Sequence, residues 1–169
     1  MVRRNVHYEA AFESYLRSVG VAHLGIDETH RAAFGVARIK SFDLLIYPPD
    51  GHNLIVDIKG RQFPYRRGRA RRYWENWVTR EDLDDLRQWQ EVFGDGFTSA
   101  FVFAYWLTEP QPDGPIEPDC VYHDEVYAFR VCPLAEYEAH ARPRSPKWAT
   151  LAVSASTFRR IARPVATLW

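Results

Sequence analysis

Residues 41–62, with the sequence SFDLLIYPPDGHNLIVDIKGRQ, decide the fold that this chain is expected to adopt. Two short apolar runs, 42–47 and 54–58, flank the turn sequence PPDG at 48–51. This pattern is typical of two β-strands joined by a turn. Because side chains alternate along a strand, Asp57 and Lys59 are expected on one face of the sheet, and Val56 and Ile58 on the other.

Three charged side chains interrupt these apolar runs: Asp43, Asp57 and Lys59. If the turn pairs the two strands, Asp43 lies beside Asp57 on the same face. Placing two carboxylates and a lysine on a half-buried sheet costs desolvation free energy, which is usually accepted for a divalent cation or for a network of charges. We take the divalent cation as the working hypothesis.

At these positions the sequence resembles the PD-(D/E)XK nuclease superfamily, and especially its members similar to Holliday-junction resolvases. The resemblance consists of Asp43, the Asp57-x-Lys59 motif on the adjacent strand, and a preceding helix that carries Glu9. It covers about residues 5–107. The helix also has the spacing with which such resolvases begin, at Glu9, Phe12, Leu16 and Gly20.

The start of that helix, HYEAAFE at 7–13, resembles the signature of a bacterial family known as HYExAFE proteins, a name that carries no established activity. The segment SFD at 41–43 lacks the proline that names the nuclease superfamily, although that proline is often replaced.

The superfamily resemblance implies a restriction-endonuclease-like α/β fold, with an αβββαβ core whose mixed central sheet is flanked by helices. We expect one nuclease-like domain over residues 1–169, with its core at about 5–107 and a C-terminal strand and helix extension at 108–169. A hydrophobic content of 46% is enough for the core of one domain. Residues 98–107, apolar on both faces, predict a central strand, and RPRSP at 142–146 predicts an irregular linker.

The resemblance also implies a function, the metal-dependent hydrolysis of phosphodiester bonds in nucleic acid, with DNA as the expected substrate. Asp43 and Asp57 would bind the metal, the carbonyl of Ile58 would add a third oxygen, and Glu9 would join directly or through water. Lys59 would orient the attacking water and stabilise charge on the scissile phosphate. A ligand set made of oxygen atoms favours Mg²⁺ or Mn²⁺ over Zn²⁺.

A second helix is expected from the capping-box sequence TRED at 79–82 to Phe93, because Gly94 follows. Gln90 projects into the middle of its apolar stripe, so the amide needs a buried hydrogen-bond partner or a cavity. In several nucleases of the superfamily such a helix supplies a polar residue to the catalytic site, and Gln90 looks similar. The alternative is a core glutamine bonded to backbone groups.

Residues 61–77, RQFPYRRGRARRYWENW, combine arginines with aromatic side chains directly after the Asp-x-Lys motif. Arginine binds phosphate with two hydrogen bonds and aromatic rings stack on unpaired bases, so this segment predicts a nucleic-acid contact beside the site. The alternative is a solvated basic loop that pairs with a partner protein or with the acidic residues 109–125. The residues expected to bind nucleic acid are Arg61, Arg66, Arg67, Arg69, Arg71, Arg72, Tyr73 and Trp74.

The composition of the whole chain narrows the class of protein. The 22 Lys and Arg residues balance the 22 Asp and Glu residues, so no net field favours nucleic acid. Cys120 and Cys132 form no C-x-x-C spacing, which argues against a disulfide framework and a cysteine zinc site. No run approaches the length of a membrane span and no apolar signal segment follows the N-terminus, so we expect a cytoplasmic protein without membrane contact.

Two other classes of function stay open. One is a catalytically inactive module that keeps the nuclease fold and binds nucleic acid. The other is a protein-interaction module, in which the basic loop and the acidic segment join two copies into a homodimer. The sequence has no G-x-x-x-x-G-K-[ST] loop, no G-x-G-x-x-G after a strand and no G-x-S-x-G, so other common enzyme classes are not indicated.

Overall fold

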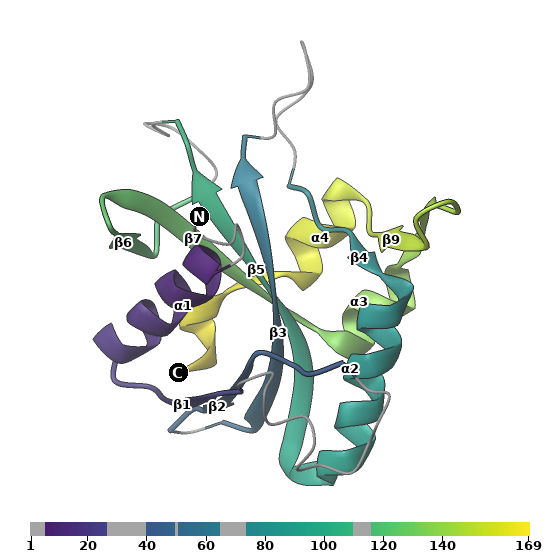
Figure 1. Cartoon of the computed structure of the whole chain (residues 1–169), viewed down its shortest axis with the longest axis horizontal. Helices are drawn as coiled ribbons and strands as arrows, with labels where there is room; N and C mark the ends of the chain where they lie inside the picture. The colour runs from purple at the N-terminus through teal and green to yellow at the C-terminus, as the bar shows by residue number, and fades with distance from the viewer. Residues whose placement is uncertain (1–5, 27–39, 50, 65–73, 110–115) are drawn as a thin grey trace.

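Figure 1 shows the chain as a computed structural model, which describes residues 6–26, 40–49, 51–64, 74–109 and 116–169. Its helices are α1 (Val6–Ser18), α2 (Arg80–Phe93), α3 (Leu134–His140) and α4 (Ala155–Ile161). Its strands are β1 (Ala22–Gly25), β2 (Leu44–Tyr47), β3 (Asn53–Phe63), β4 (Val78–Thr79), β5 (Phe97–Leu107), β6 (Cys120–Tyr122), β7 (Glu125–Pro133), β8 (Arg142–Ser145), β9 (Thr150–Ala152) and β10 (Arg163–Pro164). None of the helices in these ranges is long and apolar enough to span a bilayer.

The central sheet has the strand order β1-β2-β3-β5-β7-β10, and β6 pairs with β7. Strands β3 and β5 run parallel, whereas the other neighbouring pairs of this sheet are antiparallel. A second sheet contains β4, β9 and β8. Apart from the short β4, the elements from α1 to β5 follow the expected α-β-β-β-α-β order, so the predicted α/β fold with a mixed central sheet is confirmed.

Helices cover both faces of the central sheet, with α1 on one face and α2, α3 and α4 on the other (Figure 1). The central strand β5 is buried on both faces, as its apolar sequence predicts. Its face toward α1 carries compact side chains, those of Ala100, Val102 and Ala104. Its face toward α2 carries large rings, those of Phe101, Phe103 and Tyr105. The layer of β5 side chains beneath α1 is therefore thinner than the layer beneath α2, so α1 can lie close to the sheet.

The residues after 107 complete the central sheet. Strand β7 pairs along β5 from Ala100↔Pro133 to Leu107↔Val126. Residues 142–146 were predicted to be an irregular linker, but Arg142–Ser145 forms β8, which pairs with β9 through a register irregularity. This prediction was wrong because β9 supplies backbone hydrogen-bond partners that the local composition does not reveal.

Helix α1 approaches β3 closely at Gly60. A Cβ atom built on this glycine would lie 2.5 Å from Cγ and 2.6 Å from Cε2 of Tyr8, so only glycine leaves room for the ring. Tyr8 precedes Glu9 in the chain, and Gly60 follows Lys59. The contact between Tyr8 and Gly60 therefore sets how close α1 comes to the candidate site.

Replacing Gly60 by alanine is expected to destabilise the protein by about 1–3 kcal/mol, because the added methyl group pushes Tyr8 and α1 away from β3. Each kcal/mol corresponds to a fall of roughly 2–4 °C in Tm for a chain of this size. Thermal unfolding followed by circular dichroism measures the change. Gly96→Ala is the control, because its Cβ would meet nothing within 4 Å. Equal Tm values for the two variants would contradict the close contact.

Candidate functional site

Asp43 directly precedes β2 and lies beside β3. The register of the β2–β3 pair starts at Leu44↔Val56, and Asp43 N donates to the same Val56 carbonyl at 2.9 Å, so the regular pairing ends before Asp43. Phe42 belongs to the core on the α2 side and Leu44 to the core beneath α1, so the alternation of side chains is also interrupted at Asp43. Asp43 lies close enough to Asp57 for their charges to interact, but it is not the directly opposite residue that a regular hairpin predicts.

The two faces of β3 separate apolar from charged side chains. Val56 and Ile58 belong to the core beneath α1, and Ile55 belongs to the core on the side of α2. Because strand residues alternate, Asp57 and Lys59 project toward α2. The predicted alternation along this strand is confirmed.

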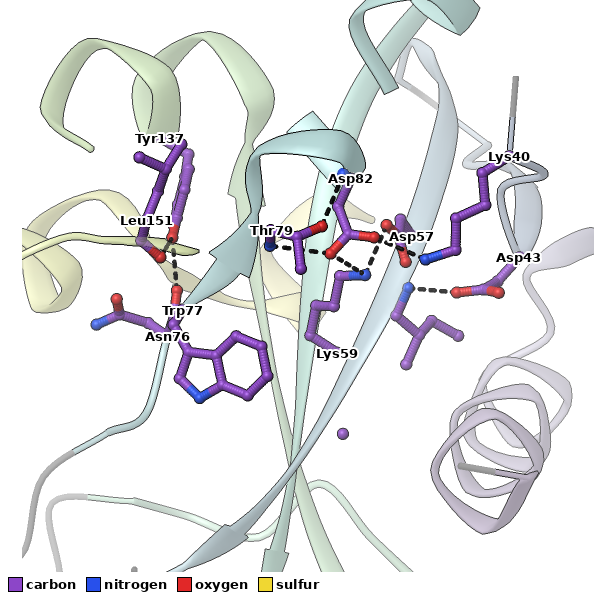
Figure 2. Close-up of polar contacts among 12 residues, drawn as sticks. Lys40, Asp43, Asp57, Lys59, Asn76, Trp77, Thr79, Asp82, Tyr137 and Leu151 are labelled. Atoms are coloured by element: carbon purple, nitrogen blue, oxygen red, sulfur yellow. Dashed lines mark hydrogen bonds and ion pairs between the residues drawn. The ribbon is translucent and has the colours of Figure 1, made fainter. Parts of the chain in front are cut away.

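A short hydrogen bond fixes the Asp43 carboxylate at the edge of β3. The backbone N–H of Ile58 donates to Oδ2 of Asp43 at 2.5 Å (Figure 2). The N–H and C=O groups of one strand residue point to the same edge of the strand, so the Ile58 carbonyl also points toward the Asp43 side. Two oxygen groups that the sequence predicted as metal ligands therefore lie at one edge of β3.

Lys59 is held between two carboxylates (Figure 2). Its Nζ lies 2.9 Å from Oδ2 of Asp57 and 3.1 Å from Oδ2 of Asp82, and its side chain is only 12% exposed. The other carboxylate oxygen of Asp82 binds Nζ of Lys40 at 2.8 Å. Asp57, Lys59 and Asp82 thus form a largely buried charge network, with Lys40 at its half-exposed rim. In such a network the loss of one charge leaves another buried and unpaired.

The sequence identified Asp82 only as a capping residue. The capping box is present, with Asp82 N donating to Thr79 Oγ1 and Thr79 N donating to Asp82 Oδ2, both at 3.0 Å. The approach of this helix end to Lys59 is a tertiary feature that residue spacing does not reveal. Burial alone would raise the pKa of Asp82, but Lys59, Lys40 and the Thr79 bonds together hold it well below its usual range.

The two other carboxyl groups show the opposite shift. Burial raises the pKa of Asp43 well above its ordinary value, the charges of Asp57 and Glu9 raise it further, and the Ile58 hydrogen bond opposes them. Burial also raises the pKa of Asp57, although the adjacent Lys59 opposes this effect. The site therefore holds more negative charge than its lysines balance, which a bound cation would relieve.

Glu9 approaches the site from the other layer of the fold. Helix α1 covers the face of β3 that carries Val56 and Ile58, whereas Asp57 and Lys59 lie on the opposite face. Glu9 is partly buried, and its charge is among those that raise the pKa of Asp43. Within the described ranges, no group of three or more His, Cys, Asp or Glu side chains is arranged to hold a metal ion. The predicted carboxylates are thus electrostatically coupled but are not gathered into one cluster.

Gln90 is occupied by backbone groups. Its Nε2 donates to Phe97 O at 2.7 Å, and its Oε1 accepts from Ser99 N at 2.6 Å. These bonds join the end of α2 to the start of β5, two turns of helix away from Asp82. The structure therefore matches the alternative interpretation of Gln90, a core glutamine bonded to backbone groups.

Two residues that were predicted to contact nucleic acid have partners within the protein. The guanidinium of Arg61, which is partly buried, lies 4.2 Å from the ring centre of Trp77 and donates to the Trp77 carbonyl, and burial lowers the pKa of Arg61. Trp74 is 9% exposed and packs against Tyr105 with 4.3 Å between ring centres. The ring of Trp74 is therefore not available for the predicted contact, whereas Arg61 keeps a partly exposed side chain. The other predicted contacts lie outside the described residues, namely Arg66, Arg67, Arg69, Arg71, Arg72 and Tyr73.

Comparison with solved structures gives a likeness in fold. The chain is similar to Hjc, a Holliday junction resolvase from the archaeal hyperthermophile Archaeoglobus fulgidus, with a TM-score of 0.56 and 12% identity over 98% of this chain and 94% of that chain. No protein-family model matches the sequence, and no curated protein matches it. The likeness shows the fold alone, and both the PD-(D/E)XK and the HYExAFE resemblances stay predictions.

Replacing Asp43 by asparagine is expected to stabilise the metal-free protein at pH 8, because it removes a buried carboxylate whose pKa is raised in the folded state. The raised pKa means that the folded state binds this proton more readily than the unfolded state does. The free energy of unfolding of the wild-type protein therefore rises as the pH falls. The difference in stability between the wild type and the variant disappears at about pH 4.

Urea unfolding in the presence of a chelator, repeated from pH 4 to pH 8, measures this difference. Asp95→Asn serves as the control, because Asp95 is an exposed aspartate on the turn after α2. Addition of Mg²⁺ should then stabilise the wild-type protein more than the Asp43 variant. A variant that is less stable than the wild type at pH 8 without metal would rule out an excess of negative charge at Asp43.

Proposed function

We propose that the protein is a metal-dependent nuclease that hydrolyses phosphodiester bonds in nucleic acid, with DNA as the expected substrate. The observation that carries the proposal is that the Asp43 carboxylate accepts a hydrogen bond from Ile58 N of β3, between Asp57 and Lys59 on the same strand. This placement occurs on a fold similar to that of a Holliday junction resolvase. Fold alone does not determine function, so the proposal depends on the chemistry of these side chains.

The donor groups at this edge fit a hard divalent cation such as Mg²⁺ or Mn²⁺. Asp43 and Asp57 would bind it together with the carbonyl of Ile58, and Glu9 would join directly or through water. Mg²⁺ is usually held by one or two carboxylates and keeps several waters, so a cluster of three carboxylates is not required. When bound, the ion would supply a more acidic water and neutralise charge on the phosphoryl oxygens.

Lys59 has the position of a residue that orients the attacking water and stabilises charge on the scissile phosphate. Its contacts with Asp57 at 2.9 Å and Asp82 at 3.1 Å restrict the ammonium group to a small region beside the carboxylates. Because the Lys59 ammonium group is already held in place before the substrate binds, less entropy is lost when it is positioned at the reacting phosphate. Asp82 would act here as a positioning residue, because it holds Lys59 and is bonded to the start of α2.

One observation favours the alternative of a catalytically inactive nuclease fold. In the described ranges the lysine of the motif is engaged by two carboxylates, and the acidic side chains do not converge in a group of three. Such a network could serve stability alone. An inactive module would bind nucleic acid without divalent-dependent cleavage, and a protein-interaction module would form a homodimer that weakens as salt rises.

Asp57→Asn is expected to reduce cleavage at least 100-fold, because it removes a charged metal ligand while the Lys59–Asp82 pair remains. The assay follows labelled single-stranded, duplex and four-way-junction DNA with Mg²⁺, Mn²⁺ or chelator. Asp84→Asn is the control, since Asp84 lies on α2 and pairs with Arg87 instead. Cleavage by Asp57→Asn at the wild-type rate would reject the assignment, and wild-type binding without cleavage would support the inactive module.

Lys59→Ala is a less suitable test of catalysis. This variant leaves Asp57 without its lysine partner and leaves Asp82 with Lys40 alone. Breaking a buried ion pair in this way costs about 3–5 kcal/mol. Loss of activity in Lys59→Ala therefore has to be compared with its stability before it is assigned to catalysis.

The arginine-rich segment gives a separate prediction about binding. Changing Arg66, Arg67 and Arg69 together to alanine should weaken binding to all DNA sequences alike and flatten its dependence on salt, as expected for phosphate contacts. Fluorescence anisotropy over a salt series measures both effects. Arg159→Ala and Arg160→Ala on α4 provide a control that also removes exposed arginines. An unchanged salt dependence in the triple variant would exclude this segment from phosphate binding.

A further inference from the structure

The α1 side of the sheet carries a pocket that the candidate active site does not use. Its volume is about 480 Å³, and it lies between the first turn of α1, the end of β5 and the β6–β7 hairpin. Figure 1 shows α1 beside the β6–β7 hairpin, and α1 contacts both β5 and β6. The walls are mainly aromatic and include one carboxylate: His7, Trp106, Tyr122, His123, Tyr127 and Glu125.

Hydrogen bonds hold several of these side chains in place. His7 Nδ1 lies 2.7 Å from the Tyr127 hydroxyl, and Trp106 Nε1 donates to Glu125 Oε2 at 2.7 Å. The β6–β7 turn consists of His123 and Asp124, which have φ values of 48° and 63°, as a tight two-residue hairpin turn requires. The pocket is therefore largely formed before any ligand enters.

The charges around the pocket restrict what it can bind. No lysine or arginine is among the described residues that line it. A neighbouring cleft of about 490 Å³ shares Trp106 and Glu125 and adds Glu109 and Asp124. Phosphate would be repelled by this rim, whereas a flat, uncharged group with hydrogen-bond donors would be attracted. The volume is also suitable for a nucleoside-sized group.

We infer that this pocket binds an unpaired guanine base of the nucleic acid, an inference that rests on the proposed nuclease function. The aromatic walls would stack on the base, as in single-strand binding. A carboxylate accepts two hydrogen bonds side by side, and guanine offers adjacent N1–H and N2–H donors to Glu125. Adenine and cytosine place a ring nitrogen acceptor beside the amino group, which a carboxylate repels.

The pocket and the candidate site lie on different faces of the sheet. His7 and Glu9 share the first turn of α1, and the charge of Glu9 acts on Asp43. Ile58 pairs with Val102 in β5, and Trp106 lies four residues further on, about 13 Å along the strand at roughly 3.3 Å per residue. Trp106 belongs to the layer of α1, whereas Asp57 and Lys59 face α2, so the pocket would hold a base at some distance from the cleaved bond.

Nucleosides test the pocket separately from cleavage, because they carry no phosphate and need no metal. Calorimetry on the full chain measures the binding of guanosine, inosine, adenosine and cytidine. Guanosine is expected to bind about tenfold more tightly than adenosine. Inosine should have an intermediate affinity, because it lacks the N2 donor. Glu125→Gln should lose this preference. Glu91→Gln, an exposed glutamate on α2, should keep it. Tighter binding of N-acetyl-arginine amide than of guanosine would overturn the inference in favour of a cationic peptide.

Cleavage supplies the second measurement. Single-stranded DNA with one guanine is expected to be cut preferentially near that base by the wild-type protein and by the control Glu91→Gln, whereas Glu125→Gln should lose the preference. Cleavage by the wild type without guanine preference, together with no binding of guanosine, overturns the pocket assignment and leaves the nuclease proposal intact. Guanosine binding that depends on Glu125 in a protein without cleavage supports the pocket as a base site and rejects the nuclease proposal.

Discussion

The ion pairs of Lys59 with Asp57 and Asp82 are the interaction on which the arrangement of the site depends. They join β3 to the first turn of α2, whose start is fixed by the Thr79 capping box. Removing these charges from water costs free energy, and this cost is offset only while each charge keeps its oppositely charged partners. The beginning of α2 and the motif strand are therefore parts of one electrostatic unit, and a change to either one alters the charge balance of the site.

The two layers of the fold supply different parts of this site. Large rings fill the α2 side of β5, whereas compact side chains and Gly60 allow α1 to lie close on the other side. Asp57 and Lys59 come from the α2 side, and Glu9 comes from α1. Asp43 lies between them at the strand edge. The depth of packing beneath α1 therefore decides how strongly Glu9 acts on Asp43.

The sequence predicted the features that depend on neighbours in the chain. The alternation of Asp57 and Lys59 and the capping box at Thr79 both follow from local spacing. Tertiary packing determined the rest, because Asp82 joins Lys59 from another element and Gln90 bonds to the β5 backbone. The arginine-aromatic run shows the same limit: its composition is that of a binding loop, yet Trp74 is buried and Arg61 packs on the ring of Trp77.

The distribution of charge distinguishes a structural network from a site prepared for a cation. Asp82 contacts both Lys40 and Lys59, and Asp57 contacts Lys59, so these carboxylates are at least partly compensated. Within the part of the chain that the structure describes, Asp43 has no ion pair with a lysine or arginine, and its raised pKa reflects burial beside Asp57 and Glu9. A network serving only stability has no need for this carboxylate, since an uncharged side chain could accept the Ile58 hydrogen bond at lower cost. The remaining negative charge lies where the Ile58 carbonyl also points, which is the arrangement expected if a divalent cation completes the site.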